Sequence, residues 1–145
     1  MSMKFALITS EFNPEVTEGL RAGALEVMEE QGIPSPDLFP APGAFEMPLI
    51  AKSLAATGKY NGVICLGCVI KGDTAHFEFI SLGAAVGIQN ASLETGVPIA
   101  FGILTTYTDE QARVRSLPDA HNKGREATLA VISSAKILKH IRARD

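Results

Sequence analysis

Hydrophobic residues along this chain follow two alternating patterns, short continuous runs and longer segments with helical spacing. The runs lie at 4–9, 62–67 and 97–104, and their apolar content is typical of strands in the interior of a parallel sheet. Longer segments predict helices at 16–31, 44–56, 74–94 and 122–141, with a short helix at 109–115. Four prolines, at 34, 36, 40 and 42, leave room for only a short strand near 37–40, which we expect at a sheet edge.

The alternation of strands and helices predicts the fold class. Parallel strands joined by right-handed helical crossovers form a sheet that helices cover on both faces. We therefore expect an α/β fold, a three-layer αβα sandwich around a four-stranded parallel sheet. The chain has 145 residues, close to the size of one compact domain, so we expect a single domain over residues 1–145.

Composition and charge narrow the classes of partner. Hydrophobic residues make up 46% and charged residues 20% of the chain, as in globular proteins, and the apolar runs end well before membrane-spanning length. The first residues lack the apolar stretch and cleavage site of a signal peptide, so we expect a cytoplasmic protein without a membrane partner. A formal net charge of -3 gives no electrostatic reason to expect nucleic acid binding.

The two cysteines, Cys65 and Cys68, have Cys-x-x-Cys spacing inside an apolar strand pattern. A zinc ribbon needs a second such pair, and redox motifs of this type usually open a helix. Free cysteines are commonly buried, so we expect packing or substrate contact here and no metal site.

Unusual residues follow each predicted strand, where open parallel sheets bind their ligands. SEFN occupies 10–13, PGAFE occupies 42–46 and CVIKGDTAH occupies 68–76. In the third segment Gly72 permits close backbone approach, and Asp73 or Thr74 can cap a helix whose first N–H groups bind an anion. An ordinary glycine turn with a capped helix is the alternative. Arg115 favours the anion site if it reaches this turn, because a guanidinium can bind phosphate at two points.

His76 falls in the first turn of the helix that follows. The positive end of the helix dipole favours the neutral imidazole, which can accept a proton. A lone histidine is more often structural or simply exposed, but a neighbouring anion site favours general acid–base catalysis.

Two phenylalanines, Phe12 and Phe45, follow predicted strands and can stack on a flat heterocycle. For Phe45 a place in the core is equally consistent with the pattern, since large apolar side chains are usually buried. Glu46 is most simply explained as a solvated acid in the first turn of a helix, with ligand contact as the lesser alternative.

Taken together, five dispersed motifs give the chain a strong resemblance to a known family. They are SEFN at 10–13, PGAFEMP at 42–48, LGCVIKGDTAHF at 66–77, FGILTTYTDEQA at 101–112 and NKGREA at 122–127. In this order they resemble the lumazine synthases nearly end to end. The resemblance implies a flavodoxin-like fold and the condensation of 5-amino-6-(D-ribitylamino)uracil with 3,4-dihydroxy-2-butanone 4-phosphate, with no metal or cofactor.

The resemblance also implies roles for individual residues. The pyrimidine would lie against Phe12, and the ring and ribityl chain would be surrounded by Ala44, Phe45, Glu46, Cys68, Val69 and Ile70. Phosphate would be held by Gly72, Asp73, Thr74 and Arg115, and His76 would transfer protons. Lys123 and Glu126 would complete the site from the start of the last helix. Phe101 would come from a neighbouring subunit, so the resemblance implies a homo-oligomer with a shared active site, expected as a cyclic pentamer, with a sixty-subunit shell as the alternative.

The sequence departs from the family pattern at two places, and three other functions are alternatives to lumazine synthesis. Glu11 stands where family members often have Arg, and Ser116 to Asp119 replace a connection that is often Ala-Gly. The rivals are an archaeal-type riboflavin synthase, a flavin-binding or shell-forming homologue with little turnover, and a receiver-type signalling domain. The last needs an Asp at the end of the third strand, where this chain has Leu66-Gly67-Cys68.

Overall fold

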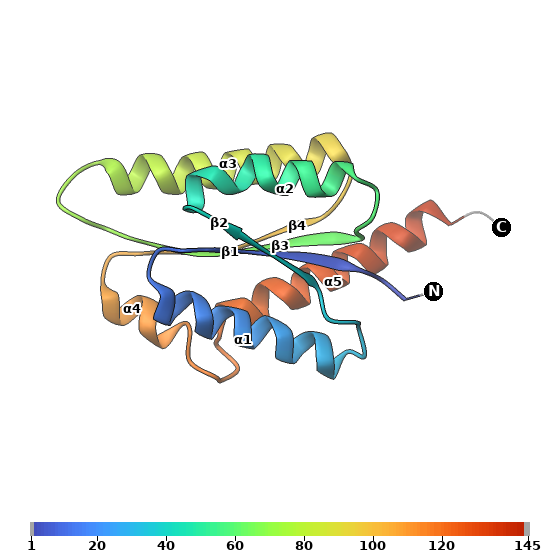
Figure 1. Ribbon diagram of the computed structural model, residues 1–145, viewed down its shortest axis with the longest axis horizontal. Helices are drawn as coiled ribbons and strands as arrows, with labels where there is room; N and C mark the ends of the chain where they lie inside the picture. The colour runs from blue at the N-terminus through green and yellow to red at the C-terminus, as the bar shows by residue number, and fades with distance from the viewer. Residues whose placement is uncertain (1, 144–145) are drawn as a thin grey trace.

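The computed structural model of the chain describes residues 2–143. Its elements in chain order are β1 (Phe5–Ser10), α1 (Pro14–Glu30), β2 (Asp37–Ala41), the 3-10 turn η1 (Ala44–Glu46), α2 (Met47–Ala56), β3 (Gly62–Ile70), α3 (His76–Thr95), β4 (Ile99–Thr106), α4 (Asp109–Val114) and α5 (Lys123–Arg142). The four strands are all parallel and lie in the order β2-β1-β3-β4. Helices α2 and α3 cover one face of the sheet, and α1, α4 and α5 cover the other (Figure 1). The predicted three-layer αβα sandwich is confirmed.

The core consists of two layers, one on each face of the sheet. Phe5 and Leu7 of β1 pack with α1 and α5, whereas Ala6 and Ile8 pack with α2 and α3. Both β1 and β3 have a strand on each side, and their side chains alternate between the two layers. This double burial explains why their sequences are continuous apolar runs.

Strand β2 lies at an edge of the sheet, as its prolines predict. It pairs only with β1, where Pro40 stands opposite Thr9. A proline has no N–H to donate to a ladder, so it is tolerated where one side of the strand is unpaired.

The third strand is longer than its apolar run predicts, and the helix after it begins later. Its pairing with β4 continues to Val69 opposite Thr105 and Ile70 opposite Thr106. The Lys71 N–H then donates to the Thr106 carbonyl at 2.9 Å. Backbone pairing therefore continues past the buried residues. Positions 68–70 belong to the strand, and α3 begins at His76.

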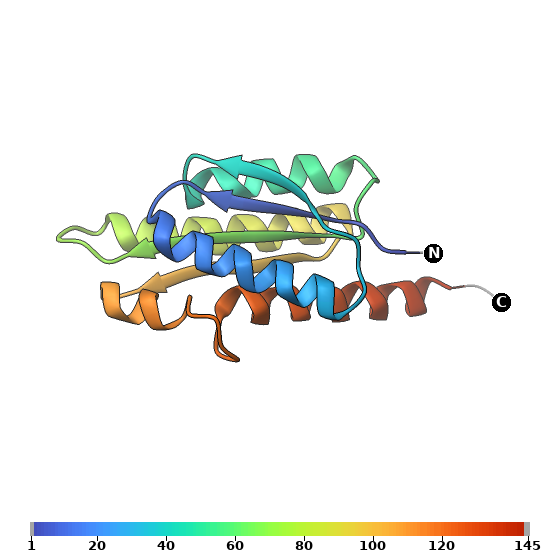
Figure 2. The same cartoon turned by 60° about the horizontal axis from the view of Figure 1, so that its bottom comes forward.

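All four strands end on the same side of the molecule. In Figure 2 the arrowheads point to one end, opposite to the C-terminal end of α5. The segments after β1, β2 and β3 meet at this end, which is where the sequence predicts a ligand site. Within residues 2–143 no helix is long and apolar enough to cross a bilayer.

Candidate functional site

A cavity of about 430 Å³ lies at the carboxyl ends of β1 and β3, on the face covered by α2 and α3. We call it the aromatic pocket. Its lining residues are Phe12, Asn13, Gly43, Ala44, Phe45, Glu46, Cys68, Val69, Ile70, His76 and Ile80. The structure thus brings together eight residues that the sequence predicts for one site, from three separate segments.

Two exposed aromatic side chains border this pocket. Phe12 is 66% and Phe45 is 56% exposed, which decides against a core position for Phe45. A Cβ at Gly43 would lie 3.2 Å from the Phe12 ring, and a Cβ at Gly83 of α3 would lie 2.8 Å from the Phe45 ring. Glycines therefore let both rings lie close against the backbone, where they can contact a flat ligand.

Asn13 is a pocket residue that the sequence interpretation missed. It has a left-handed backbone with φ of 56° and precedes Pro14, the first residue of α1. Its side-chain amide donates to the Cys68 carbonyl at 3.2 Å, which connects the start of α1 to the end of β3. The signal was present, since asparagine adopts this conformation more readily than most residues and Asn-Pro favours a turn.

The two cysteines are free thiols in an apolar environment. Burial raises the pKa of the Cys65 thiol to about 12. Burial and, to a lesser extent, the charge of Asp109 raise the pKa of the Cys68 thiol to about 11. Both thiols are therefore protonated near neutral pH and poor nucleophiles, which favours packing over redox work. Among the described residues no cluster of three or more His, Cys, Asp or Glu side chains is suited to bind a metal.

His76 is the first residue of α3 and lines the aromatic pocket. Its backbone N–H donates to the Thr74 hydroxyl at 3.3 Å. The residue at the N-cap position is Ala75, and its backbone is helical. The expectation that Asp73 or Thr74 occupies the cap position is therefore wrong, because the chain bends at Asp73 and Thr74 and turns at Ala75 before the helix begins at His76. This segment is exposed, and a Cβ at Gly72 would meet open space.

A second cavity, of about 670 Å³, lies beside the edge strand β4. We call it the basic pocket after its two cations, Arg115 and Lys123, which share it with the carboxylates of Asp119 and Glu126. Its lining residues are Phe101, Ile103, Leu104, Thr105, Thr106, Val114, Arg115, Leu117, Asp119, His121, Lys123 and Glu126. Four of the predicted site residues, Phe101, Arg115, Lys123 and Glu126, therefore gather here, away from His76.

The charged groups of the basic pocket are held by local contacts. The Arg115 guanidinium donates to the Gln111 carbonyl at 3.0 Å. The Lys123 ammonium lies 3.0 Å from a carboxylate oxygen of Glu126. Arg115 is exposed and Lys123 is half-buried, so an anion can reach both cations.

Arg115 does not reach the glycine turn within this chain. It follows α4, which lies on the opposite face of the sheet from α3 (Figure 1). The two-point phosphate site expected from Arg115 and residues 72–74 is therefore not formed by a single chain. The structure instead shows two separate pockets, the aromatic pocket with His76 and the basic pocket with Arg115 and Lys123.

Comparison with known proteins agrees with these features. The sequence profile described as 6,7-dimethyl-8-ribityllumazine synthase matches residues 2–139. The chain is 60% identical over 141 residues to 6,7-dimethyl-8-ribityllumazine synthase 1 of Caulobacter vibrioides, covering 96% of this chain and 92% of the relative. It is 50% identical over 141 residues to 6,7-dimethyl-8-ribityllumazine synthase of Deinococcus radiodurans, covering 96% and 91%. Over nearly its whole length, the chain therefore belongs to the 6,7-dimethyl-8-ribityllumazine synthase family.

Proposed function

We propose that this chain condenses 5-amino-6-(D-ribitylamino)uracil with 3,4-dihydroxy-2-butanone 4-phosphate to give 6,7-dimethyl-8-ribityllumazine, phosphate and water. The observation that carries this proposal is the aromatic pocket, where His76 lies beside two exposed phenylalanines at the carboxyl end of the sheet. A flat pyrimidine can stack on such rings, and a histidine beside it can move protons. The proposed reaction uses no metal or cofactor.

We treat the aromatic pocket and the basic pocket as two half-sites of one active site, each with a distinct task. Phe12 and Phe45 contact the pyrimidine, with Ala44, Glu46 and the end of β3 from Cys68 to Ile70 around its edge and its ribityl chain. Gly72, Asp73 and Thr74 hold the phosphate together with Arg115, and Lys123 and Glu126 lie beside them. His76 assists imine formation, phosphate elimination and ring closure by general acid–base catalysis. Holding two reactants in register supplies much of the remaining rate enhancement.

The separation of the half-sites supports an active site shared between subunits. We propose a homo-oligomer, a cyclic pentamer in the simplest arrangement, in which the basic pocket of one subunit faces the aromatic pocket of its neighbour. Phe101, Arg115 and Lys123 then join His76 from the next chain. Apolar side chains on α3 agree with burial in an assembly, since Phe79 is 73%, Leu82 66% and Leu93 71% exposed. The mass in solution separates a pentamer from a sixty-subunit shell. For the location in the cell we propose the cytoplasm.

Replacing His76 tests the proposed chemistry. We expect His76→Ala to retain binding of the pyrimidine and to lose most turnover, because positioning remains while proton transfer is lost. The measurement is the appearance of lumazine fluorescence with both substrates present. His140→Ala is the matched control, since His140 is an exposed histidine in the last turn of α5, far from either pocket in the chain. Unchanged turnover in His76→Ala would contradict the proposed role.

Product analysis also separates lumazine synthesis from the alternative functions. Formation of riboflavin from lumazine alone would identify an archaeal-type riboflavin synthase. Binding of riboflavin without any lumazine formation would identify a binding or scaffold homologue.

A further inference from the structure

The two cations of the basic pocket, Arg115 and Lys123, lie at the two ends of one loop. Arg115 follows the last residue of α4, and Lys123 is the first residue of α5. The Lys123 N–H donates to the Arg115 carbonyl at 2.8 Å, so the loop closes on itself. The positions of both cations therefore depend on how this loop, residues 115–123, is fixed to the rest of the molecule.

The loop has two distinct faces. Leu117, Asp119 and His121 line the basic pocket together with the two cations. Ser116 and Asn122 face α1 instead, since a Cβ at Gly19 would lie 2.3 Å from the Ser116 carbonyl oxygen and a Cβ at Gly23 2.3 Å from Oδ1 of Asn122. One face of the loop thus forms the pocket, and the other rests on glycines of α1.

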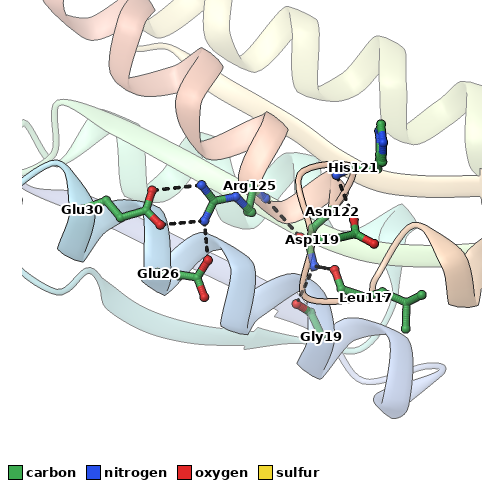
Figure 3. A network of polar contacts seen from close by, with 8 residues as sticks. All are labelled: Gly19, Glu26, Glu30, Leu117, Asp119, His121, Asn122 and Arg125. Atoms are coloured by element: carbon green, nitrogen blue, oxygen red, sulfur yellow. Dashed lines mark hydrogen bonds and ion pairs between the residues drawn. The ribbon is translucent and has the colours of Figure 1, made fainter.

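Asn122 is the main polar connection between this loop and α1. Its side-chain amide donates to the Gly19 carbonyl at 3.1 Å and to the Leu117 carbonyl at 2.9 Å. Its Oδ1 accepts from the Arg125 N–H at 3.1 Å, which caps α5. The residue is 0% exposed, and these three bonds use both amide hydrogens and the carbonyl oxygen (Figure 3).

We infer that Asn122 is a positioning residue, which fixes the loop so that Arg115 and Lys123 are held in place to bind the phosphate of the substrate. The inference rests on the proposed function and assigns a role to a residue that touches no substrate. A buried asparagine with three bonds to three different segments is costly to rearrange, because each lost partner leaves a buried polar group unsatisfied. Without these bonds the loop that carries both cations is no longer fixed to α1, although the charges of the cations remain.

A nearby contact provides a control for simple loss of stability. The Arg125 guanidinium lies 2.9 Å and 3.0 Å from the carboxylate oxygens of Glu30 and also pairs with Glu26, both on α1 (Figure 3). These bonds join the same two helices, but the Arg125 side chain forms no hydrogen bond to the loop. A change at Arg125 therefore weakens the helix contact without releasing the cations.

The test is a comparison of Asn122→Ser, Asn122→Asp and Arg125→Met in the assembled enzyme. Ser and Asp can both cap α5, but neither can donate to the Gly19 and Leu117 carbonyls as the amide does. We expect KM for the butanone phosphate to rise about tenfold in the two Asn122 variants, equivalent to about 1.4 kcal/mol, with KM for the pyrimidine changed by less than about twofold. Arg125→Met should lower the midpoint of thermal unfolding and leave both KM values unchanged.

Three results would overturn the inference. They are an unchanged KM for the butanone phosphate in both Asn122 variants, an equal rise of both KM values, and a failure of both variants to fold, which would make Asn122 a requirement of the fold itself.

Failure of the proposed function is a separate result, seen as absence of lumazine formation by the unaltered enzyme. In that case calorimetry with inorganic phosphate decides the inference. Weaker binding by Asn122→Ser than by the unaltered chain supports it, and equal binding or no binding by either chain overturns it.

Discussion

At the scale of single residues, the two thiols illustrate how burial controls chemistry. Cys65 and Cys68 have pKa values raised to about 12 and about 11. In the folded protein at pH 8 we expect both to react with iodoacetamide at least about 100-fold more slowly than in the urea-unfolded chain, because burial removes both thiolate and access. Mass spectrometry after timed labelling measures the difference. Labelling of the folded protein at the unfolded rate would show that the apolar environment of the thiols is wrong.

The same thiols predict how stability depends on high pH. Their pKa is raised above the ordinary value of 9.0, so the folded state favours the protonated form. This contribution is fully present below pH 9 and is lost as the pH rises towards 11 and 12, because the unfolded chain ionises first. The midpoint of urea unfolding should therefore fall over this range, and less so in a variant with both cysteines changed to Ala. An equal fall in that variant would assign the effect to other groups.

Residue types and their place after strands predicted much of the aromatic pocket, but not every contact in it. The position of Phe45 was undecided in the sequence, because helical spacing does not distinguish a core phenylalanine from one at a pocket. The structure decided it, because the Phe45 ring is exposed and lies against Gly83 of α3. Similarly, the sequence did not predict that Arg115 lies away from residues 72–74. Its position depends on which face of the sheet α4 covers, and contacts across the whole fold determine that face.

At the scale of elements, the contact between α1 and α5 depends on close backbone approach. A Cβ at Gly124 would lie 1.9 Å from the Leu20 carbonyl oxygen. We expect Gly124→Ala to lower the free energy of unfolding by about 3 kcal/mol, since the helices must separate and the buried side chains between them lose contact. Urea unfolding followed by circular dichroism measures this loss. Gly72→Ala is the control, because its Cβ would meet open space, and a loss there as large as at Gly124 would contradict the steric explanation.

The element boundaries show what hydrophobic patterns can predict. Buried strands such as β1 stand out, because both faces are apolar. The last part of β3 was not predicted as strand. Val69 and Ile70 are only partly buried, and the backbone pairing that joins them to β4 leaves no hydrophobic pattern in the sequence. The start of α3 was placed too early for a related reason. Residues Asp73 to Ala75 contain no strong helix breaker, so the sequence pattern gave no sign of the bends and the turn that they form before His76.

At the scale of the whole molecule, we propose that subunits share one active site, because the aromatic pocket and the basic pocket are separate within one chain. If His76 of one subunit works with Arg115 of the next, then a mixture of His76→Ala and Arg115→Ala chains contains sites with both residues intact. Co-expression in equal amounts should restore about a quarter of the unaltered activity, since each intact site needs one particular choice in each of two neighbouring subunits. Each variant alone should have little activity. The control is a double variant that carries both His76→Ala and Arg115→Ala. Mixed with either single variant, it should restore no activity, because no site then has both residues intact. Absence of restored activity in mixed assemblies of normal mass would show that His76 and Arg115 do not act across a subunit boundary.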